Sequence, residues 1–233
     1  MTVPNHAINA ILIPNLPFDS VKDFAPVTTL STSDYVLVVH PSVPAESLKA
    51  FVAFARSRPG QLNYGSVGSL GISQLGTELF SQMTGIKMQR VPYKGSAPAL
   101  IDLVSGQLQA GFNTPISAIQ HIRNRRLRAI AVSGAKRSPQ YPDVEAIAET
   151  YPDYAMIAYS CFAVRKETPE DIKQRMNRLL MDALYEPAVM EKVKQLGMTP
   201  EPQNMTIAQC EAFVAREREI WTRAIKLAKI EPQ

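Results

Sequence analysis

Glycine and serine residues are concentrated in one short segment, Gly65-Ser66-Val67-Gly68-Ser69-Leu70-Gly71, which lies between a strand-like run and a helix-like run. These residue types could bind an anion, because glycine lets backbone N–H groups converge and serine hydroxyls add further donors. A helix that begins directly after the loop would add its unpaired first-turn amides and the positive end of its dipole. The segment therefore predicts a site for a carboxylate or a phosphate. The same residues are also typical of a strand-to-helix turn that binds nothing.

A second polar pair, Asn113 and Thr114, follows an apolar strand-like run and precedes a helix that opens with Pro115. In open α/β folds, ligands bind at the carboxyl ends of the strands of the sheet. We therefore expect Asn113 and Thr114 to line the same site as the glycine and serine loop.

The cysteines and histidines form no recognisable catalytic or metal-binding pattern. Cys161 and Cys210 are far apart in the sequence and lack a CxxC partner, so we expect neither a disulfide nor a zinc site. Cys161 lies in a strand-like run and Cys210 on the apolar side of a helix, so both are expected to be buried. The histidines are dispersed; they are His6, His40 and His121. The sequence thus predicts no metal ion and no cofactor.

The composition is that of an ordinary globular protein. The chain has 233 residues, of which 45% are hydrophobic, with a net charge of +4 and an isoelectric point near 9.1. The densest basic cluster contains no aromatic residue and has no nucleic-acid recognition helix beside it, so we predict no nucleic-acid binding. It consists of Arg123, Arg125, Arg126 and Arg128. No stretch is apolar enough to span a membrane, and the first residues lack the charged and apolar regions of a signal peptide.

Strand-like and helix-like segments alternate from about residue 24 onward, which predicts an α/β protein with a largely parallel or mixed sheet. The expected strands are 25–30, 35–40, 62–65, 87–91, 108–112, 127–132 and 155–164. The expected helices are 47–57, 72–84, 97–105, 115–123, 144–149, one that starts near Thr168 and a last one that starts at Thr206. Gly85 and Gly106 have the positions of glycines that end helices.

The last helix is expected to be structural. Thr206 and Gln209 have the spacing of a capping box, which satisfies the first backbone N–H groups of a helix. Trp221 lies on the apolar stripe of this helix, and that position is more typical of a core residue than of a ligand platform.

Several segments, in order and with matching spacing, resemble one known family over essentially the whole chain. These segments are Asp23 to Val27, Leu37 to Ser42, Leu62 to Tyr64 with the loop that follows, Val91 to Leu100, and Ala135 to Ser138. The sequence is similar to the substrate-binding proteins of tripartite tricarboxylate transporters, the Bug or TctC family. Val91 to Leu100, with the sequence VPYKGSAPAL, is the most specific of these segments.

The resemblance implies a two-lobed fold of the periplasmic-binding-protein type (type II), with a small organic carboxylate held between the lobes and no chemistry done on it. It implies a periplasmic location and, as partners, the membrane components of the transporter. We expect a second lobe at residues 41–156 and a first lobe from 1–40 and 157–233, joined by crossover strands at 33–40 and 157–164. The expected ligand-binding residues are His6, Gly65, Ser66, Gly68, Ser69, Asn113, Thr114 and Ser160.

The sequence departs from the family pattern at its beginning, where Thr2 to Leu12 matches a segment that normally follows the signal peptide and the first βα units. A mis-called start codon, a degraded gene copy and a repurposed protein would each give this sequence. If the chain starts as written, it would be cytoplasmic, with an incomplete first lobe that leaves the Trp221 helix without a full partner. We would then expect weak carboxylate binding or none, and lower stability than that of a complete relative.

Two other functions remain open at this stage. One is a ligand-sensing or otherwise repurposed binding domain, although no helix-turn-helix segment precedes residue 24. The other is an α/β enzyme that uses Cys161 or Ser160 as its nucleophile, which would need a histidine within hydrogen-bond reach. Ser160 stands where many relatives have an aromatic residue, and Leu70 where they have a small polar one, so the particular acid is not indicated.

Overall fold

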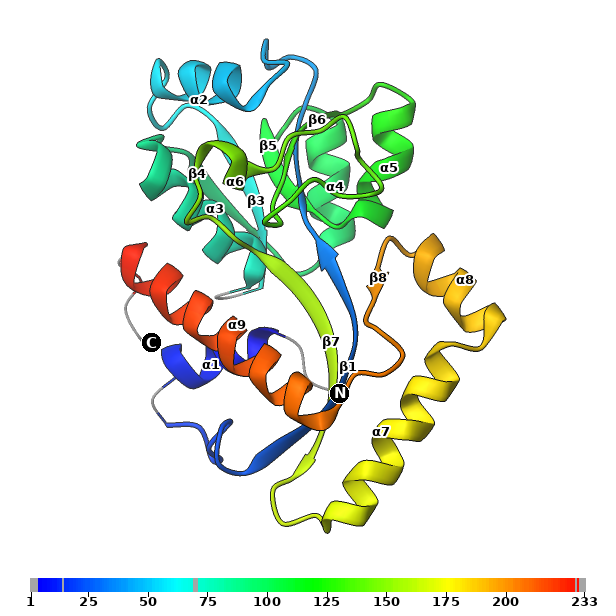
Figure 1. Ribbon diagram of the computed structural model, residues 1–233. Helices are drawn as coiled ribbons and strands as arrows, with labels where there is room; N and C mark the ends of the chain where they lie inside the picture. The colour runs from blue at the N-terminus through cyan, green and yellow to red at the C-terminus, as the bar shows by residue number, and fades with distance from the viewer. Residues whose placement is uncertain (1–3, 14, 69–70, 229, 231–233) are drawn as a thin grey trace. The chain divides into compact units, whose positions relative to one another are not determined.

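The structure is a computed structural model that describes residues 4–13, 15–68, 71–228 and 230. The chain forms two compact units, the first from residues 1–33 and 158–233 and the second from residues 34–157. The predicted α/β fold is confirmed, since both units combine a sheet with helices (Figure 1).

The first unit contains a three-stranded sheet with the order β7-β1-β8, in which β1 and β8 are antiparallel. Figure 1 shows β1 and β7 as two long strands that run side by side. The strands are β1 (Phe24–Asp34), β7 (Ile157–Arg165) and β8 (Thr199–Pro200). The helices are α1 (Pro4–Leu12), α7 (Glu170–Leu184), α8 (Pro187–Gln195) and α9 (Ile207–Leu227).

The second unit contains a five-stranded mixed sheet with the order β4-β3-β5-β2-β6. Strand β3 is parallel to both β4 and β5, whereas β2 is antiparallel to β5 and β6. The strands are β2 (Val36–Val39), β3 (Asn63–Val67), β4 (Gln89–Tyr93), β5 (Ala110–Asn113) and β6 (Arg128–Val132). The helices are α2 (Leu48–Arg56), α3 (Ile72–Thr84), α4 (Ser96–Val104), α5 (Pro115–Arg123) and α6 (Ile147–Thr150).

The first chain crossing between the units differs from the prediction. The crossover strand was expected at 33–40, beside 157–164. Instead, β2 pairs inside the sheet of the second unit, and the strand beside β7 is β1, which ends at Asp34. The division between the units falls at Ser33 and Asp34 rather than at residue 40. Strand β1 continues through the polar residues 31–34, beyond the expected end at residue 30, so the local pattern does not show where the chain changes sheets.

Ser133 fastens the two ends of the second unit to each other. The backbone N–H of Tyr35 donates to Ser133 Oγ at 2.7 Å, and the Ser133 N–H donates to the Tyr35 carbonyl at 2.8 Å. On the other side, Ser133 Oγ donates to the carbonyl of Met156, whose N–H donates to the Ser133 carbonyl at 3.0 Å. Because Tyr35 and Met156 stand next to the two division points, one buried serine holds both ends of this unit together.

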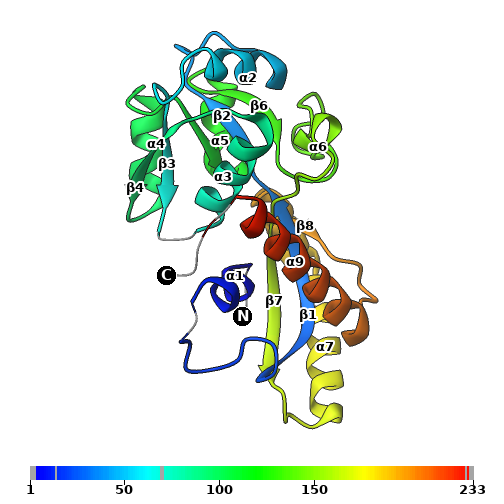
Figure 2. The ribbon, with the colours of Figure 1, turned by 90° about the vertical axis from the view of Figure 1, so that its left-hand side faces the viewer.

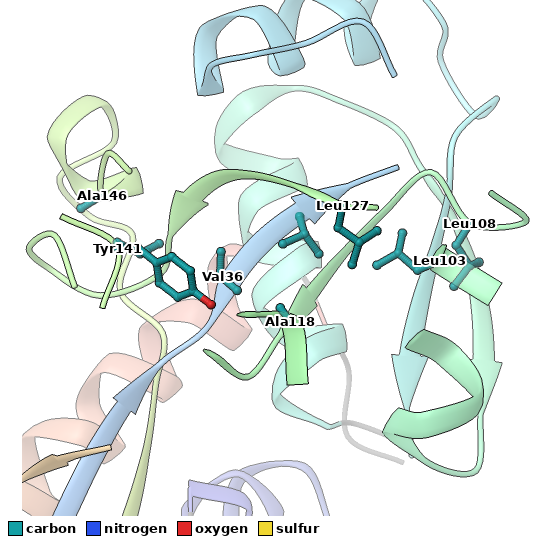
Figure 3. Close-up of a cluster of buried hydrophobic side chains, with 9 residues drawn as sticks. Val36, Leu103, Leu108, Ala118, Leu127, Tyr141 and Ala146 are labelled. Carbon is teal, nitrogen blue, oxygen red and sulfur yellow. The ribbon is translucent and has the colours of Figure 1, made fainter. Parts of the chain in front are cut away.

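The sheet of the second unit is covered on both faces, which explains why β2 is a continuous apolar run. One face packs against α4 and α5 through a cluster of buried side chains, shown in Figure 3. The cluster comprises Val36, Val38, Leu103, Leu108, Ala118, Leu127, Val132, Tyr141 and Ala146. The opposite face carries an aromatic cluster centred on Phe80 of α3, whose ring lies 6.2 Å from that of Phe112 on β5 and 6.1 Å from that of Tyr154.

The ends of two helices follow the predicted signals. Gly85 adopts a left-handed conformation with φ of 69° at the end of α3, as expected for a terminating glycine. Thr206 Oγ1 accepts the N–H of Gln209 and the Gln209 side chain accepts the Thr206 N–H, which confirms the capping box of α9.

Trp221 corrects one expectation and confirms another. Its side chain is only 1% exposed, so it is a core residue, and the helix that carries it has a partner in the first unit. That partner is α1, which lies beside α9 (Figure 2). The expectation that the Trp221 helix lacks a full partner is therefore wrong, because α1 was not predicted as a helix and supplies the buried Ile8 and Leu12.

Glu217 of α9 gives the first unit a predicted dependence on pH. Its side chain is 4% exposed, and burial raises the pKa of the carboxyl to about 7, against which Arg216 acts weakly. A carboxyl whose pKa is raised by folding stabilises the protein below its unfolded pKa of 4.5 and loses that contribution as the pH rises through about 7. We expect Glu217→Gln to raise the free energy of unfolding by about 2 to 3 kcal/mol at pH 8, and to leave it nearly unchanged at pH 4.

The control is Glu219→Gln, which removes the same charge from an exposed position two residues along the same helix. Urea unfolding between pH 4 and 8 measures the effect. Parallel pH profiles for wild type and Glu217→Gln would show that Glu217 is not the group responsible.

Candidate functional site

The candidate site lies at one edge of the five-stranded sheet, where three helices begin. Strands β4, β3 and β5 run parallel, so their carboxyl ends meet at the same edge. Each strand is followed by a helix, α4, α3 and α5 respectively, and the amino ends of these helices therefore face that edge. Their N-cap residues are Gly95, Gly71 and Thr114.

None of these three N-cap residues makes a side-chain capping bond within the part of the chain that the structure describes. The two glycines have no side chain to offer, and Thr114 Oγ1 instead donates to Ser117 Oγ at 3.0 Å. First-turn amides that no side chain caps are donors for an anion, and three parallel helix dipoles add positive potential at the same edge. The edge is therefore suited to holding a carboxylate or a phosphate.

The end of β3 is held by hydrogen bonds to β4 and to α3. The N–H of Gly68, whose φ is 71°, donates to the carbonyl of Tyr93 at 3.1 Å. The N–H of Val67 donates to Ser73 Oγ at 3.3 Å. A Cβ added to Gly71 would collide with the carbonyl oxygen of Val67, so only glycine fits there. Val67 and Gly68 are therefore tied to neighbouring elements, and position 71 accepts only glycine.

Arg90 of β4 brings a cation to this loop, and the sequence analysis missed it. Its Nε donates to Ser66 Oγ at 2.8 Å, and its Nη2 lies 3.4 Å from the carbonyl oxygen of Gly68. Ser66 is fully buried, whereas Arg90 is exposed. The guanidinium therefore adds positive charge beside the loop and uses one lone pair of the Ser66 hydroxyl.

The family-specific segment Val91 to Leu100 supports the glycine and serine loop. Its Tyr93 accepts the Gly68 N–H through the backbone, and its phenol donates to Asp102 Oδ2 at 2.6 Å. Burial, together with the hydrogen bond to Asp102 and the charge of Asp102, raises the pKa of Tyr93 to about 12. Asp102 on α4 thus holds the side chain of Tyr93, and the Tyr93 carbonyl in turn holds Gly68 of the loop.

Tyr93→Phe is expected to keep the loop but weaken its support. The variant loses one charge-assisted hydrogen bond and leaves Asp102 without this donor, so we expect the free energy of unfolding to fall by about 1 to 2 kcal/mol. Thermal unfolding measures this loss. The double variant with Asp102→Asn should cost less than the sum of the two single variants, and additive costs would contradict the proposed linkage.

Four of the predicted ligand residues lie at this edge or next to it, namely Ser66, Gly68, Asn113 and Thr114. Gly65 is in β3, where an added Cβ would come within 2.8 Å of Leu108 Cδ1, so its small size also serves packing against neighbouring side chains. Asn113 Nδ2 donates to the carbonyl of Gly111 at 3.3 Å, which leaves its side-chain oxygen to act as an acceptor. Ser69 and Leu70 lie outside the described residues. The ligand contacts of all these residues stay a prediction.

The other two predicted ligand residues belong to the first unit. Ser160 is in β7, and His6 lines a cavity of about 290 Å³ within that unit. The His6 ring stacks on Phe18 with centroids 5.8 Å apart and meets the edge of Phe24 at 5.1 Å. Its Nε2 has no hydrogen-bond partner among the described residues. A role for His6 and Ser160 in ligand binding stays a prediction.

Cys161 lies next to another cysteine, not next to a histidine. Both cysteines are buried as predicted, and Cys161 Sγ is 3.7 Å from Cys210 Sγ. Cys210 Sγ also lies 3.3 Å from Thr29 Oγ1. The pKa of Cys210 is raised, first by its hydrogen bond with Cys161 and then by burial. Nothing in this geometry activates Cys161 as a nucleophile.

The residues that sequence reasoning missed are those whose role depends on pairing between strands. Arg90 reaches the loop because β4 pairs in parallel with β3, in a register that places Arg90 opposite Tyr64. Ser73 was read as a helix residue, although a serine just inside a helix that follows a glycine loop is a common backbone acceptor. Within the described residues, no group of three or more His, Cys, Asp and Glu side chains could hold a metal ion, and no helix has the length and hydropathy of a membrane span.

Comparison with known families gives one match over nearly the whole chain. The model described as "Tripartite tricarboxylate transporter family receptor" matches residues 2–230. Protein BugT of Bordetella pertussis is 32% identical over 94% of this chain and 67% of its own length. A relative from Pseudomonas sp. strain P51 is 33% identical over 82% of this chain. The chain spans 57% of the length of that relative.

Solved structures with the same fold include proteins with bound acids. A protein of R. palustris, solved with adipate, is 29% identical to this chain, with a TM-score of 0.87. The match covers 100% of this chain and 78% of the R. palustris protein. MatC of Rhodopseudomonas palustris, solved with malate, is 25% identical to this chain, with a TM-score of 0.81. The match covers 96% of this chain and 78% of MatC. A structure described as a periplasmic transporter is 31% identical with a TM-score of 0.81, over 97% of this chain and 75% of its own.

Proposed function

Because the chain belongs to the tripartite tricarboxylate transporter family of receptors, we propose that it binds a small organic carboxylate and delivers it to the membrane components of such a transporter. The observation that carries this proposal is the likeness to two receptors solved with dicarboxylates, adipate and malate. No catalytic step is part of the proposal, since the family is one of receptors.

The geometry of the second unit supports a carboxylate as the ligand. Three helix amino ends face the edge where β3, β4 and β5 finish, and Arg90 adds a cation to the loop that follows β3. Uncapped first-turn amides bind a carboxylate without an arginine clamp, because they offer several donors and a favourable dipole together. In this proposal Ser66, Gly68, Asn113 and Thr114 form the part of the site that belongs to the second unit, together with Gly65 of β3 and with Ser69, which follows Gly68 in the sequence.

The proposed location is outside the cytoplasmic membrane, where a receptor of this family meets its ligand before transport. The support is a similar protein that is described as a periplasmic transporter.

Calorimetric titration of the purified chain with adipate, malate and citrate tests the proposal. We expect at least one acid to bind, and Ser66→Ala combined with Ser69→Ala to weaken it by about 1 to 3 kcal/mol if two charge-assisted hydrogen bonds are lost. The matched control is Ser105→Ala, an exposed serine that ends α4 at its other end. Absence of binding by every acid would overturn the proposed function. Binding that the double variant leaves unchanged would remove only the loop from the site.

A further inference from the structure

Two successive side-chain pairs align α9 with β7 in the core of the first unit. Tyr159 of β7 meets the ring of Phe213 on α9 edge-on, with centroids 5.3 Å apart. Cys161, two residues further along the same face of the strand, meets Cys210, one helical turn before Phe213, with the sulfur atoms 3.7 Å apart. Because the two pairs are held in register by the same strand and helix, the approach of the sulfur atoms is a property of the packing.

Contrary to the expectation from their spacing in the sequence, we propose that Cys161 and Cys210 form a disulfide bond that fastens α9 to β7 when the chain folds in an oxidising compartment. The positions are 49 residues apart in the sequence, so the bond closes a long loop. Closing a long loop restricts the unfolded chain strongly, and this restriction stabilises the folded one. The proposal does not depend on the ligand, and its test needs no ligand.

The oxidant is a compound that itself carries a disulfide, either a dithiol oxidase or oxidised glutathione. The thiolate of one cysteine attacks a sulfur of that disulfide and releases one thiolate, which leaves a mixed disulfide on the protein. The second cysteine then attacks the protein sulfur of this mixed disulfide and releases the other half of the oxidant. The two cysteines lose two electrons and two protons, and the disulfide of the oxidant becomes two thiols.

The burial of the pair determines when the bond can form. Cys161 is 1% exposed and Cys210 is fully buried, so an oxidant cannot reach either sulfur in the folded chain. Cys161 Sγ also donates to the carbonyl of Phe162 at 3.4 Å, and Thr29 Oγ1 lies 3.3 Å from Cys210 Sγ. The first contact lies within β7, and the second joins α9 to β1, so the Cys210 thiol stays in place until α9 moves away from the sheet. Oxidation should therefore accompany folding or local opening of α9, not occur on the closed structure.

Refolding the full chain with oxidised glutathione, or with a reductant, tests the proposal. After oxidation, we expect no titratable thiol in denaturant, an intact mass lower by two hydrogen atoms, and a digest that contains a cross-linked peptide with Cys161 and Cys210. We expect the Tm of the oxidised chain to exceed that of the reduced chain by about 5 °C or more. The already folded chain should be oxidised about ten-fold more slowly than the refolding chain, and urea should speed its oxidation.

The control variants are Cys161→Ser and Cys210→Ser, each of which should show the same Tm under oxidising and reducing conditions. The comparison of oxidised with reduced wild type keeps the test valid if a variant does not fold. Two thiols that stay titratable after oxidative refolding would overturn the proposal. So would a disulfide between two chains, a stable glutathione adduct, or an oxidised chain with a lower Tm than the reduced one.

Discussion

Gly71→Ala is expected to reduce carboxylate affinity at least about ten-fold and to lower the free energy of unfolding by about 1 to 3 kcal/mol. The reason is steric, because the new Cβ would overlap the carbonyl oxygen of Val67, which is backbone and cannot rotate aside. Val67 and residue 71 would have to move apart, and the N–H of Val67 would move away from Ser73 Oγ. Calorimetric titration and urea unfolding measure the two effects.

Gly95→Ala is the matched control for this prediction. Gly95 is also a glycine N-cap in an extended conformation, at the start of the neighbouring helix α4, but an added Cβ would meet only Pro98 Cδ at 3.9 Å. Both variants change the N-cap from glycine to alanine, so any difference between them reports the collision with Val67. Equal losses in the two variants would mean that the collision is relieved and that the turn is adaptable.

Phe80→Ala is expected to destabilise the second unit by about 3 to 5 kcal/mol, because it creates a large cavity in a packed core. The Phe80 side chain is fully buried, and four aromatic rings surround it. These are the rings of Phe51, Phe112, Tyr151 and Tyr154, with centroids 6.1 to 6.4 Å away. Neighbours as rigid as aromatic rings cannot collapse into the space that the phenyl group leaves.

The control is Phe54→Ala on α2, where the phenyl ring is only half-buried and its main neighbour is the guanidinium of Arg58, 4.2 Å from the ring centre. We expect a loss of about 1 kcal/mol there. Chemical unfolding with a fluorescence or circular dichroism signal compares the two. Similar losses for Phe80→Ala and Phe54→Ala would show that the aromatic cluster does not dominate the core of this unit.

The regular part of the fold could be predicted from local sequence signals. Gly85 ends α3 and the pair Thr206 and Gln209 starts α9, because capping needs only residues within a few positions of each other. The end of the first unit could not be predicted, since β1 runs on through the polar residues 31–34 and only Tyr35 separates it from β2 in the other sheet. Helix α1 was missed because its nine residues begin the chain without an acidic first turn or a basic last turn.

The candidate site was predicted in part for the same reason. The loop that includes Ser66 and Gly68 is contiguous and carries its own signal, and Asn113 and Thr114 were placed by the rule that ligands bind at the carboxyl ends of strands. Arg90 and Asp102 act on that loop from other elements, the first through strand pairing and the second through Tyr93. Their roles depend on strand register and helix packing, which no local pattern contains.

Residues 34–157 form an insertion in the first unit, and both ends of the insertion meet at Ser133. Tyr35 and Met156, which stand beside the two division points, both form hydrogen bonds with Ser133. The first and last residues of this segment therefore lie close together. Strands β1 and β7 can then pair as though the intervening residues were a single long loop. An insertion with adjoining ends can be exchanged between proteins without disturbing its host. Natural recombination and laboratory grafting would therefore both find their cleanest cut points beside Tyr35 and Met156.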